Sequence, residues 1–325
     1  MTKGKVLVTG WPLLPPAEAL LKDAGLIIVQ SSPNPSQAEL VGLLSQHRPV
    51  ALIVRTGVID CACLEADPDL KVIANHGAGY DEIDVDAATK RGIPVFAAPG
   101  RNAISVAEHV FALLLAVRKK VISHDAIVRE GQWRPATPDI GELHGRAMGI
   151  IGLGAIGERV AHLAAAFGMN LRAYDPGRSR PFPEWIQRCE ALSDILQDSD
   201  VISLHVPLTE TTHNMIDKKA LARMRRGAIL INAARGGVID ESALVAAIDK
   251  GQLLGAGLDT FAQEPPSSSS PIARCPAIVL SPHIAGVTPE SALRLSLCCA
   301  ENVTAFLVDG VCSNDLVNRT WTLSA

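Results

Sequence analysis

Three glycines that follow a short apolar run constrain the fold of this chain more than any other feature. The run at residues 148–151 leads into Gly152, Gly154 and Gly157, and apolar residues then recur at helical spacing up to Phe167. The first glycine permits a tight turn, the second allows a ligand to approach the backbone, and the third lets the helix pack on the strand. Amides at the start of such a helix face an anionic group. The pattern predicts a strand, a turn and a helix that bind the pyrophosphate of a dinucleotide.

A second expected strand, at residues 171–174, supports this interpretation because it ends in Asp175. The carboxylate lies about 20 residues beyond the glycines, where an acid binds a ribose 2′-hydroxyl and repels the 2′-phosphate of NADP. Arg178 and Arg180 follow closely and would bind that phosphate if their loop folded over it. We therefore expect NAD as the cofactor, with NADP as the alternative. A strand, turn and helix without phosphate, or a fold for another nucleotide, would also explain the motif.

The length and charge of the chain limit its other partners. The 325 residues are enough for two domains that each bury a core. The net charge of −4, without a Lys/Arg block, is not that of a nucleic-acid or membrane-surface binder, so we expect neither partner. The seven cysteines do not have the spacing of zinc ligands, so we expect reduced thiols and no metal site. No apolar stretch of about 18 residues occurs and the start of the chain resembles a strand, which favours a cytoplasmic protein that acts on small molecules.

Short apolar strands alternate with helical segments along most of the chain. Such alternation indicates parallel sheets with helices on both faces, and it occurs twice. The expected strands are residues 6–8, 26–29, 51–54, 72–74 and 94–96 in the first set, and residues 148–151, 171–174, 201–204, 229–232, 256–258 and 278–280 in the second. The sequence therefore predicts two doubly wound, parallel-sheet α/β domains.

Two helices are expected outside this alternation. Residues 102–128 are predicted to form one long helix whose middle, residues 110–117, is apolar on every side, so that a second subunit would help to cover it. Residues 288–290 supply a cap, a first-turn proline and an early acid, which predict a helix that runs to about residue 309. Its apolar face is expected to return to the first domain, which makes that domain discontinuous.

Three polar side chains follow neighbouring strands of the second set. Arg235, Glu264 and His283 come after the strands at residues 229–232, 256–258 and 278–280, at the edge where open α/β sheets bind ligands. Taken singly, each has a structural explanation: a surface ion pair, an exposed loop acid or a hydrogen-bonded histidine. Together they suit one reaction, in which the arginine binds a carboxylate and the histidine exchanges a proton near neutral pH. The glutamate would orient the imidazole and favour its protonated form.

Further motifs occur in order around these residues. They are Asp175, residues 205–209 (His-Val-Pro-Leu-Thr), residues 232–236 (Asn-Ala-Ala-Arg-Gly), residues 259–265 and residues 281–283 (Ser-Pro-His). With the glycine turn, they make the chain resemble the D-isomer-specific 2-hydroxyacid dehydrogenases over nearly its whole length. The resemblance implies an NAD-dependent oxidoreductase that interconverts a small 2-oxo acid and a D-2-hydroxy acid. In this interpretation Arg235 binds the substrate carboxylate, His283 is the acid/base and Glu264 is its partner.

The resemblance also implies an architecture and two sets of contacts. A discontinuous flavodoxin-like substrate domain is expected at residues 1–100 and 288–325, an inserted Rossmann dinucleotide-binding domain at residues 101–287, and a homodimer built around the long helix. The implied cofactor contacts are Gly152, Gly154, Ala155, Ile156, Gly157, Asp175, His205, Pro207, Thr212, Ala233, Asp259 and Gly286. The implied substrate contacts are Arg55 and a loop whose amides bind the carboxylate, Asn75, His76, Gly77, Ala78 and Gly79.

The sequence leaves the substrate side chain open. Glyoxylate and hydroxypyruvate fit the family, and a short 3-phosphoglycerate dehydrogenase is the alternative. Arg55 matches one basic position of those enzymes, but Asn75 and His76 stand where another basic residue is expected. A non-catalytic NAD-sensing protein of the co-repressor kind is an alternative of another class, although no long tail or partner surface is recognisable in the sequence. Relatives that act on formate or phosphite have first-domain residues with no match here.

Overall fold

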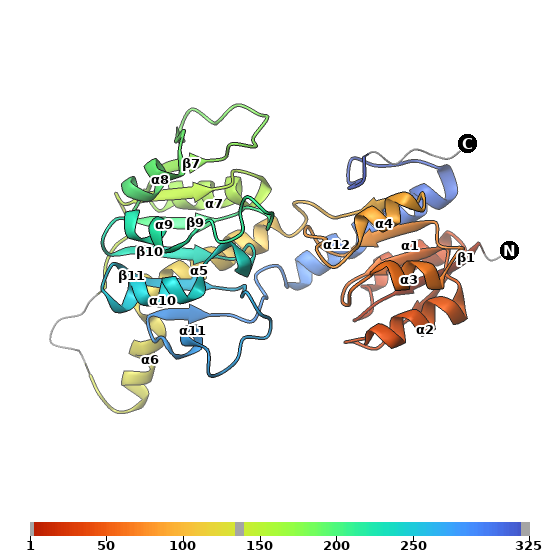
Figure 1. Ribbon diagram of the computed structural model, residues 1–325, viewed down its shortest axis with the longest axis horizontal. Helices are drawn as coiled ribbons and strands as arrows, with labels where there is room; N and C mark the ends of the chain where they lie inside the picture. Colours follow the sequence, from red (N-terminus) through yellow and green to blue (C-terminus); the bar gives the residue numbers. More distant parts are fainter. Residues whose placement is uncertain (1–2, 134–139, 320–325) are drawn as a thin grey trace. The chain divides into compact units, whose positions relative to one another are not determined.

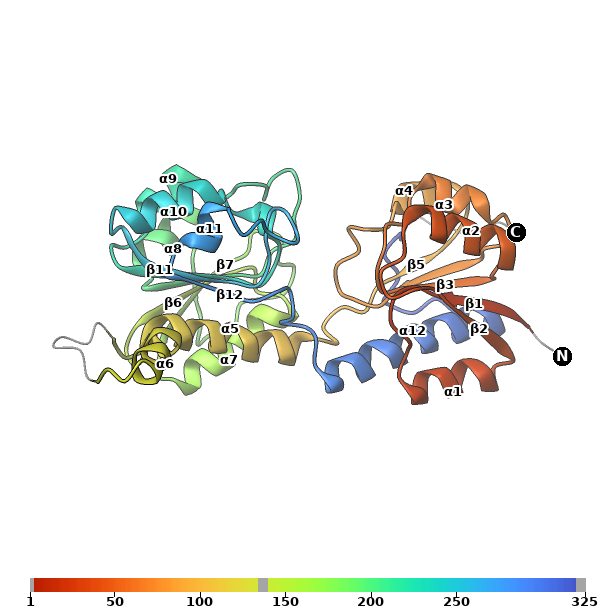
Figure 2. The same cartoon turned by 90° about the horizontal axis from the view of Figure 1, so that it is seen from below.

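The computed structural model describes residues 3–133 and 140–319, and the chain divides into two compact units (Figure 1). Unit 1 consists of Met1–Asn102 and Val287–Ala325, and unit 2 consists of Ala103–Gly286. In each unit a parallel sheet is covered on both faces by helices (Figure 2). The predicted fold class, two doubly wound α/β domains, is confirmed.

Unit 1 contains a five-stranded sheet with the order β2-β1-β3-β4-β5. Its strands are β1 (Gly4–Val8), β2 (Leu26–Gln30), β3 (Ala51–Val54), β4 (Val72–Asn75) and β5 (Val95–Phe96). All neighbours pair in parallel, and the order is that of flavodoxin-like sheets. Helices α1 (Pro15–Asp23) and α12 (Pro289–Asp309) cover one face, and α2 (Gln37–His47), α3 (Cys61–Ala66) and α4 (Val85–Lys90) cover the other (Figure 2).

Short polar side chains fix the starts of the helices in unit 1. Ser36, Asp60 and Asp84 precede α2, α3 and α4, and each accepts a hydrogen bond from an amide of the first helical turn. Thr288 caps α12 in the same way, and Gly310 ends that helix with a φ of 67°. The predicted beginning and end of the last helix are therefore confirmed.

Helix α12 belongs to the core of unit 1, although it follows unit 2 in the sequence. It packs on α1 and β4, and Cys299, Ala300 and Val303 are buried in one cluster with Val6 and Ile53 of the sheet. Within the described residues, α12 alone is long and apolar enough to cross a membrane. Of its most apolar 18-residue stretch, 44% is buried inside the protein. Core helices of soluble proteins meet the same criteria, so this finding is weak evidence for a membrane span.

A segment beyond α12 covers the edge strand β5. The amide of Val317 donates to the carbonyl of Val95 at 2.8 Å. The side chain of Asn318 accepts a hydrogen bond from the amide of Val95 and donates one to the carbonyl of Ile93, both at 2.9 Å. These bonds satisfy backbone groups that an edge strand otherwise leaves open. The two chain segments of unit 1 are thus joined through the sheet as well as through the core.

Unit 2 contains a seven-stranded parallel sheet with the order β12-β11-β10-β9-β6-β7-β8. Its strands are β6 (Ala147–Ile151), β7 (Asn170–Tyr174), β8 (Gln187–Arg188), β9 (Val201–Leu204), β10 (Ala228–Asn232), β11 (Leu253–Leu258) and β12 (Ile278–Leu280). Counted from β6, this is the dinucleotide-binding order with one strand added beyond it. The order reverses between β6 and β9, so their carboxyl ends flank the crevice in which such sheets bind ligands.

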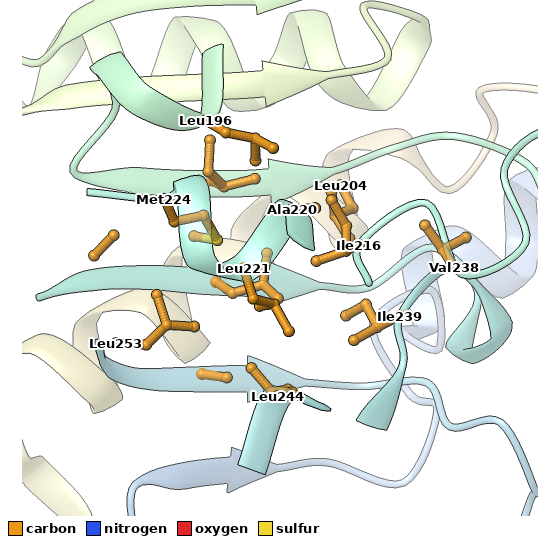
Figure 3. Packing of buried hydrophobic residues seen from close by; sticks show 14 of the residues in the cluster. Leu196, Leu204, Ile216, Ala220, Leu221, Met224, Val238, Ile239, Leu244 and Leu253 are labelled. Carbon is orange, nitrogen blue, oxygen red and sulfur yellow. The ribbon is translucent and has the colours of Figure 1, made fainter. Parts of the chain in front are cut away.

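Helices also cover both faces of this sheet. Helices α5 (Ala103–Lys119) and α7 (Ala155–Ala166) lie on one face, and α8 (Leu192–Asp198), α9 (Lys218–Arg223), α10 (Glu241–Asp249) and α11 (Pro271–Arg274) lie on the other (Figure 2). On the second face, Leu204 of β9 shares a buried cluster with Leu221 of α9 and Leu244 of α10 (Figure 3). The loops that follow β9, β10 and β11 therefore emerge from strands that are packed in this core.

The predicted single helix at residues 102–128 is wrong. The structure has two helices, α5 and α6 (Val121–Arg129), and Lys120 between them has a left-handed φ of 50°. Residues of α5 are buried as far as Val117 against α7 and the sheet, whereas no residue of α6 is buried. Unit 2 itself therefore covers most of the apolar middle of α5. Val117 is the last buried residue of α5 in the described parts of unit 2, and the direction of the chain changes shortly after it, at Lys120.

Candidate active site

The glycine turn joins β6 to α7 at the crevice of unit 2. Gly152 has a φ of 91°, and a Cβ added there would lie 2.5 Å from the carbonyl oxygen of His205. A Cβ added to Gly157 would lie 2.2 Å from the carbonyl oxygen of Gly152. At Gly154, an added Cβ would have no described atom within 4 Å. Protein packing thus accounts for the first and third glycines, and the open space at the second, beside the first amides of α7, fits a pyrophosphate.

Gly154→Ala and Gly157→Ala are expected to separate dinucleotide binding from folding. Alanine at 154 occupies the open space and should raise the Kd for NADH about tenfold or more, while the melting temperature changes by less than about 4 °C. Alanine at 157 meets the backbone of Gly152 and should destabilise unit 2 by about 2–3 kcal/mol. Fluorescence titration with NADH and calorimetry of both variants would check this. Unchanged NADH binding by the Gly154 variant would contradict the assignment of the open space to the ligand.

Asp175 lies directly after β7, beside the glycine turn. Its Oδ2 accepts a hydrogen bond from the amide of Leu153 at 2.8 Å, and its Oδ1 accepts one from the amide of Gly177 at 3.1 Å. These bonds fix the carboxylate next to the turn. Its contact with a ribose hydroxyl stays a prediction.

His205, after β9, has an unsatisfied ring nitrogen at the same edge. Its Nε2 lies 2.8 Å from the Oγ of Ser203, and its Nδ1 is buried without a hydrogen-bond partner in the described parts of the chain. Burial lowers the pKa of His205 to about 3, so the imidazole is neutral. Nearby, the hydroxyl of Thr212 donates to the carbonyl of Pro207 at 2.6 Å and closes the following turn. The other predicted cofactor residues are at this edge too: Ala155 and Ile156 at the start of α7, Ala233 after β10, Asp259 after β11 and Gly286 after β12.

Glu264 and His283 form a direct pair after β11 and β12. The Nδ1 of His283 lies 2.7 Å from Oε2 of Glu264, and Oε1 of the glutamate accepts a hydrogen bond from the amide of Phe261 at 3.0 Å. His283 has a φ of 52°, and its amide donates to the carbonyl of Asp259 at 2.8 Å. The two side chains are 49% and 38% exposed, so the imidazole is accessible to a small molecule.

Arg235 lies on the neighbouring loop after β10, which buried Asn232 shapes. The side chain of Asn232 donates to the carbonyl of Arg235 at 2.9 Å and accepts a hydrogen bond from the amide of Ala234 at 3.0 Å. A Cβ added to Gly236 would lie 1.8 Å from the carbonyl carbon of Phe261. The backbone beside Arg235 therefore packs directly on the loop that carries Glu264. The structure brings the three predicted catalytic residues to one edge of the sheet.

Asp259 anchors the segment that carries His283. Its buried carboxylate accepts hydrogen bonds from the Oγ of Ser281 at 2.6 Å and from the amides of Ile284 at 3.0 Å and Ala285 at 2.9 Å. His109 of α5 completes the group, with its Nε2 2.8 Å from the Oγ of Ser281. Sequence reasoning gave no role to Ser281 or His109. Ser281 was visible beside His283 in the motif, whereas no local pattern connects it with a histidine 172 positions earlier.

The predicted substrate loop lies in unit 1, after β4. The Nδ2 of buried Asn75 donates to the carbonyls of Gly77 at 3.2 Å and Gly79 at 2.6 Å, so this side chain shapes the loop through Ala78. The Nε2 of His76 lies 3.0 Å from the Oγ of Ser296. Arg55 follows β3 in the same unit, and its Nη1 donates to the carbonyl oxygens of Trp11 and Pro12. Burial, with a smaller contribution from the Arg55 charge, lowers the pKa of His76 to about 4.

Acid is expected to destabilise both units because His76 and His205 have lowered pKa values, about 4 and about 3. Their ordinary pKa is about 6.5, so below that pH the unfolded chain binds protons that the folded chain does not. The free energy of unfolding is therefore highest above pH 6.5, where both imidazoles are neutral in the folded and the unfolded chain. It falls as the pH is lowered toward 4. Each imidazole contributes a slope of up to about 1.4 kcal/mol per pH unit in that window.

Melting temperatures measured between pH 7.5 and pH 4.5 would check this expectation. His205→Gln should flatten the dependence of stability on pH, whereas the same change at exposed His144 should not. An identical slope for the wild type and the His205 variant would contradict the assignment.

Comparison with known proteins identifies the family. Residues 111–285 match the family model described as D-isomer specific 2-hydroxyacid dehydrogenase, NAD binding domain. The chain belongs to this family. Members are oxidoreductases that act on the CH–OH group of a 2-hydroxy acid, so this 2-hydroxyacid dehydrogenase is an enzyme with an NAD-binding domain in unit 2.

Several relatives show how far the similarity extends. A glyoxylate reductase of Korarchaeum cryptofilum is 42% identical over 256 residues, which is 77% of each chain. A D-3-phosphoglycerate dehydrogenase of Archaeoglobus fulgidus is 40% identical over 82% of this dehydrogenase, which spans only 51% of that relative. The crystal structure of a glyoxylate reductase from Paecilomyes thermophila superimposes with a TM-score of 0.88 at 28% identity, over 98% of this chain and 100% of that one. The predicted family and fold are confirmed.

Proposed function

We propose that this dehydrogenase reduces small, unphosphorylated 2-oxo acids such as glyoxylate and hydroxypyruvate to D-2-hydroxy acids with NADH. The observation that carries the proposal is the 2.7 Å pair between His283 and Glu264 at the sheet edge that also holds Arg235. Similarity to glyoxylate reductases supports the substrate class. A nicotinamide bound at the glycine turn, with its ribose at Asp175, would supply the hydride.

The protein's own groups bind the acid and move the proton. The pairing of Nδ1 with Glu264 leaves Nε2 of His283 to exchange a proton with the substrate. In the direction of reduction, the imidazolium gives this proton to the carbonyl oxygen, and Glu264 stabilises the charged imidazole before the transfer. The planar guanidinium of Arg235 binds the substrate carboxylate through two hydrogen bonds and so orients the adjacent carbonyl.

We assign unit 1 to the substrate and unit 2 to the cofactor. In unit 1, the loop held by Asn75 presents the amides that are proposed to bind the carboxylate. A substrate without a phosphate is supported by the lack of positive charge at the other expected basic position, where Asn75 is neutral and burial lowers the pKa of His76 to about 4. Similarity to phosphoglycerate dehydrogenases keeps the phosphorylated acid as the second candidate.

The decisive experiment follows nicotinamide absorbance with purified protein. NADH and NADPH are offered separately with glyoxylate, hydroxypyruvate, pyruvate, phenylpyruvate and 3-phosphohydroxypyruvate, and His283→Ala is the control. Fast oxidation of NADH by glyoxylate or hydroxypyruvate, lost in the variant, is expected. Preference for the phosphorylated acid would establish the second candidate. Binding of NADH without turnover of any acid would instead favour a non-catalytic NAD sensor.

We also propose that the enzyme is a cytoplasmic homodimer that contacts its partner through α6. Val121, Ile122 and Val128 are each more than half exposed on this helix. Such an apolar surface on a helix without buried residues is typical of a subunit interface. Ile122→Asp is expected to convert the dimer to a monomer in sedimentation experiments. A wild-type protein that is monomeric at all concentrations would contradict this assignment.

A further inference from the structure

Two arginines follow Asp175, in the segment where an NADP-binding domain places a positive charge for the 2′-phosphate. In this structure a carboxylate from another element holds both. Oε1 of Glu158, in α7, lies 2.9 Å from Nη2 of Arg178 and 3.2 Å from Nη2 of Arg180. The positive charges and their counter-charge thus form one cluster beside the predicted ribose site.

Arg178 is firmly held in this cluster. Its side chain is only 7% exposed, and its Nη1 donates to the carbonyl of Leu153. Nε and Nη2 donate to the carbonyl of Pro181 at 3.3 and 3.1 Å, and the guanidinium carbon lies 5.6 Å from the centre of the Phe182 ring. Arg180 is different, because 66% of its side chain is exposed. An exposed ion pair of this kind is weak and holds Arg180 only as long as the glutamate is charged.

Leu153 connects this cluster to the glycine turn. Its amide donates to Asp175 and its carbonyl accepts from Arg178, so both polar groups of one backbone residue bind the segment after β7. Leu153 stands between Gly152 and Gly154, the part of the turn that faces the proposed ligand. The charge of Arg178 therefore lies at the cofactor edge, and its effect on a ligand depends on whether Glu158 neutralises it.

We propose that Glu158 is a specificity-determining residue that disfavours NADP(H) by offsetting the positive charges of Arg178 and Arg180. With both arginines paired, the carboxylate of Asp175 is the charge that a ligand meets, and it accepts a ribose hydroxyl but repels a phosphate. Without Glu158, two positive charges would face a group that carries close to two negative charges. This inference rests on the proposed use of a nicotinamide dinucleotide.

The test is a fluorescence titration of NADH and NADPH into the wild type, Glu158→Gln and Glu190→Gln. Glu190 is a matched control because it pairs with an exposed arginine of the same unit, Arg188, at 3.0 Å, and its change alters the net charge equally. Glu158→Gln is expected to lower the Kd for NADPH relative to that for NADH about tenfold at low salt, and less at high salt. Glu190→Gln is expected to leave the ratio unchanged. A ratio for Glu158→Gln within twofold of the wild type would overturn the proposal.

A second variant keeps the test informative if Glu158→Gln folds poorly. Arg180→Gln alters an exposed side chain and is expected to leave the Kd values of both dinucleotides within about twofold of the wild type, because the neighbouring carboxylate of Glu158 offsets the charge of this arginine. Weaker binding of NADPH by Arg180→Gln would show that the arginine serves the phosphate in the wild type, and would overturn the proposal. A wild type that binds neither dinucleotide would refute the proposed function itself, a result distinct from an unchanged ratio.

Discussion

Replacing His283 with asparagine is expected to lower kcat about a thousandfold, within the range that a general acid–base group contributes. The asparagine amide can still reach Glu264, which holds Nδ1 of the histidine at 2.7 Å in the wild type, but it offers no exchangeable proton in place of Nε2. Because the imidazole is half exposed and not part of the core, folding should be preserved. Steady-state kinetics with glyoxylate, combined with the Kd of NADH, would separate the proton transfer from cofactor binding.

Two companion variants make this result interpretable. His144 is an exposed histidine of unit 2 that precedes β6, away from the carboxyl ends of the strands where His283 lies. His144→Asn should therefore leave kcat unchanged. Glu264→Gln has one acceptor oxygen where the carboxylate uses two, for His283 and for the amide of Phe261, and it removes the charge that stabilises the imidazolium, so its kcat should fall about 10–100-fold. If His283→Asn retains more than about a tenth of the wild-type kcat, the assignment of the general acid is wrong.

Replacing Arg235 with glutamine is expected to lower kcat/KM for glyoxylate about a thousandfold, mainly through KM. The loss corresponds to two charge-assisted hydrogen bonds to the substrate carboxylate. Arg235→Lys should recover only part of it, because a lysine cannot bind a carboxylate through a planar pair of donors. The loop that carries residue 235 is shaped by Asn232 and by the packing of Gly236, so either change should leave its backbone in place.

A neutral substrate provides the control for this second prediction. Glycolaldehyde has a carbonyl but no carboxylate, so the wild type should strongly prefer glyoxylate, whereas Arg235→Gln should have little preference between the two. A variant that still prefers glyoxylate by the wild-type factor would show that another group binds the carboxylate. The comparison depends on substrate charge alone and is therefore insensitive to a general loss of active protein.

Much of the fold, and the placing of the three candidate residues at one sheet edge, could be predicted because the decisive signals are local. An apolar run before a glycine turn specifies β6 and α7, and parallel strands bring their carboxyl ends to one edge whatever lies between them. Arg235, Glu264 and His283 could thus be placed together from three separate strand ends. The cap and stop of α12 are likewise local, at Thr288 and Gly310.

Other features depend on partners far along the chain and could not be predicted. The break at Lys120 arises because the core contacts of α5 end at Val117, a fact set by α7 and the sheet. The contact between His109 and Ser281 joins a helix to a strand end 172 positions away. The pairing of Glu158 with Arg178 depends on how the segment after β7 returns over α7. The spacing of residues in the sequence does not predict contacts of this kind.

The discontinuity of unit 1 also determines the order in which a newly made chain can fold. Sheet strands β1 to β5 are synthesised first, but Cys299, Ala300 and Val303 of their core arrive only after all of Ala103–Gly286. At 5–20 residues per second, the ribosome takes on the order of 10–40 s to make this intervening unit. Unit 2 is contiguous and can complete its own core in that time, while the face of the unit 1 sheet that awaits α12 stays exposed. The half made first is therefore finished last, and the nascent chain is most prone to aggregation and chaperone binding during that interval.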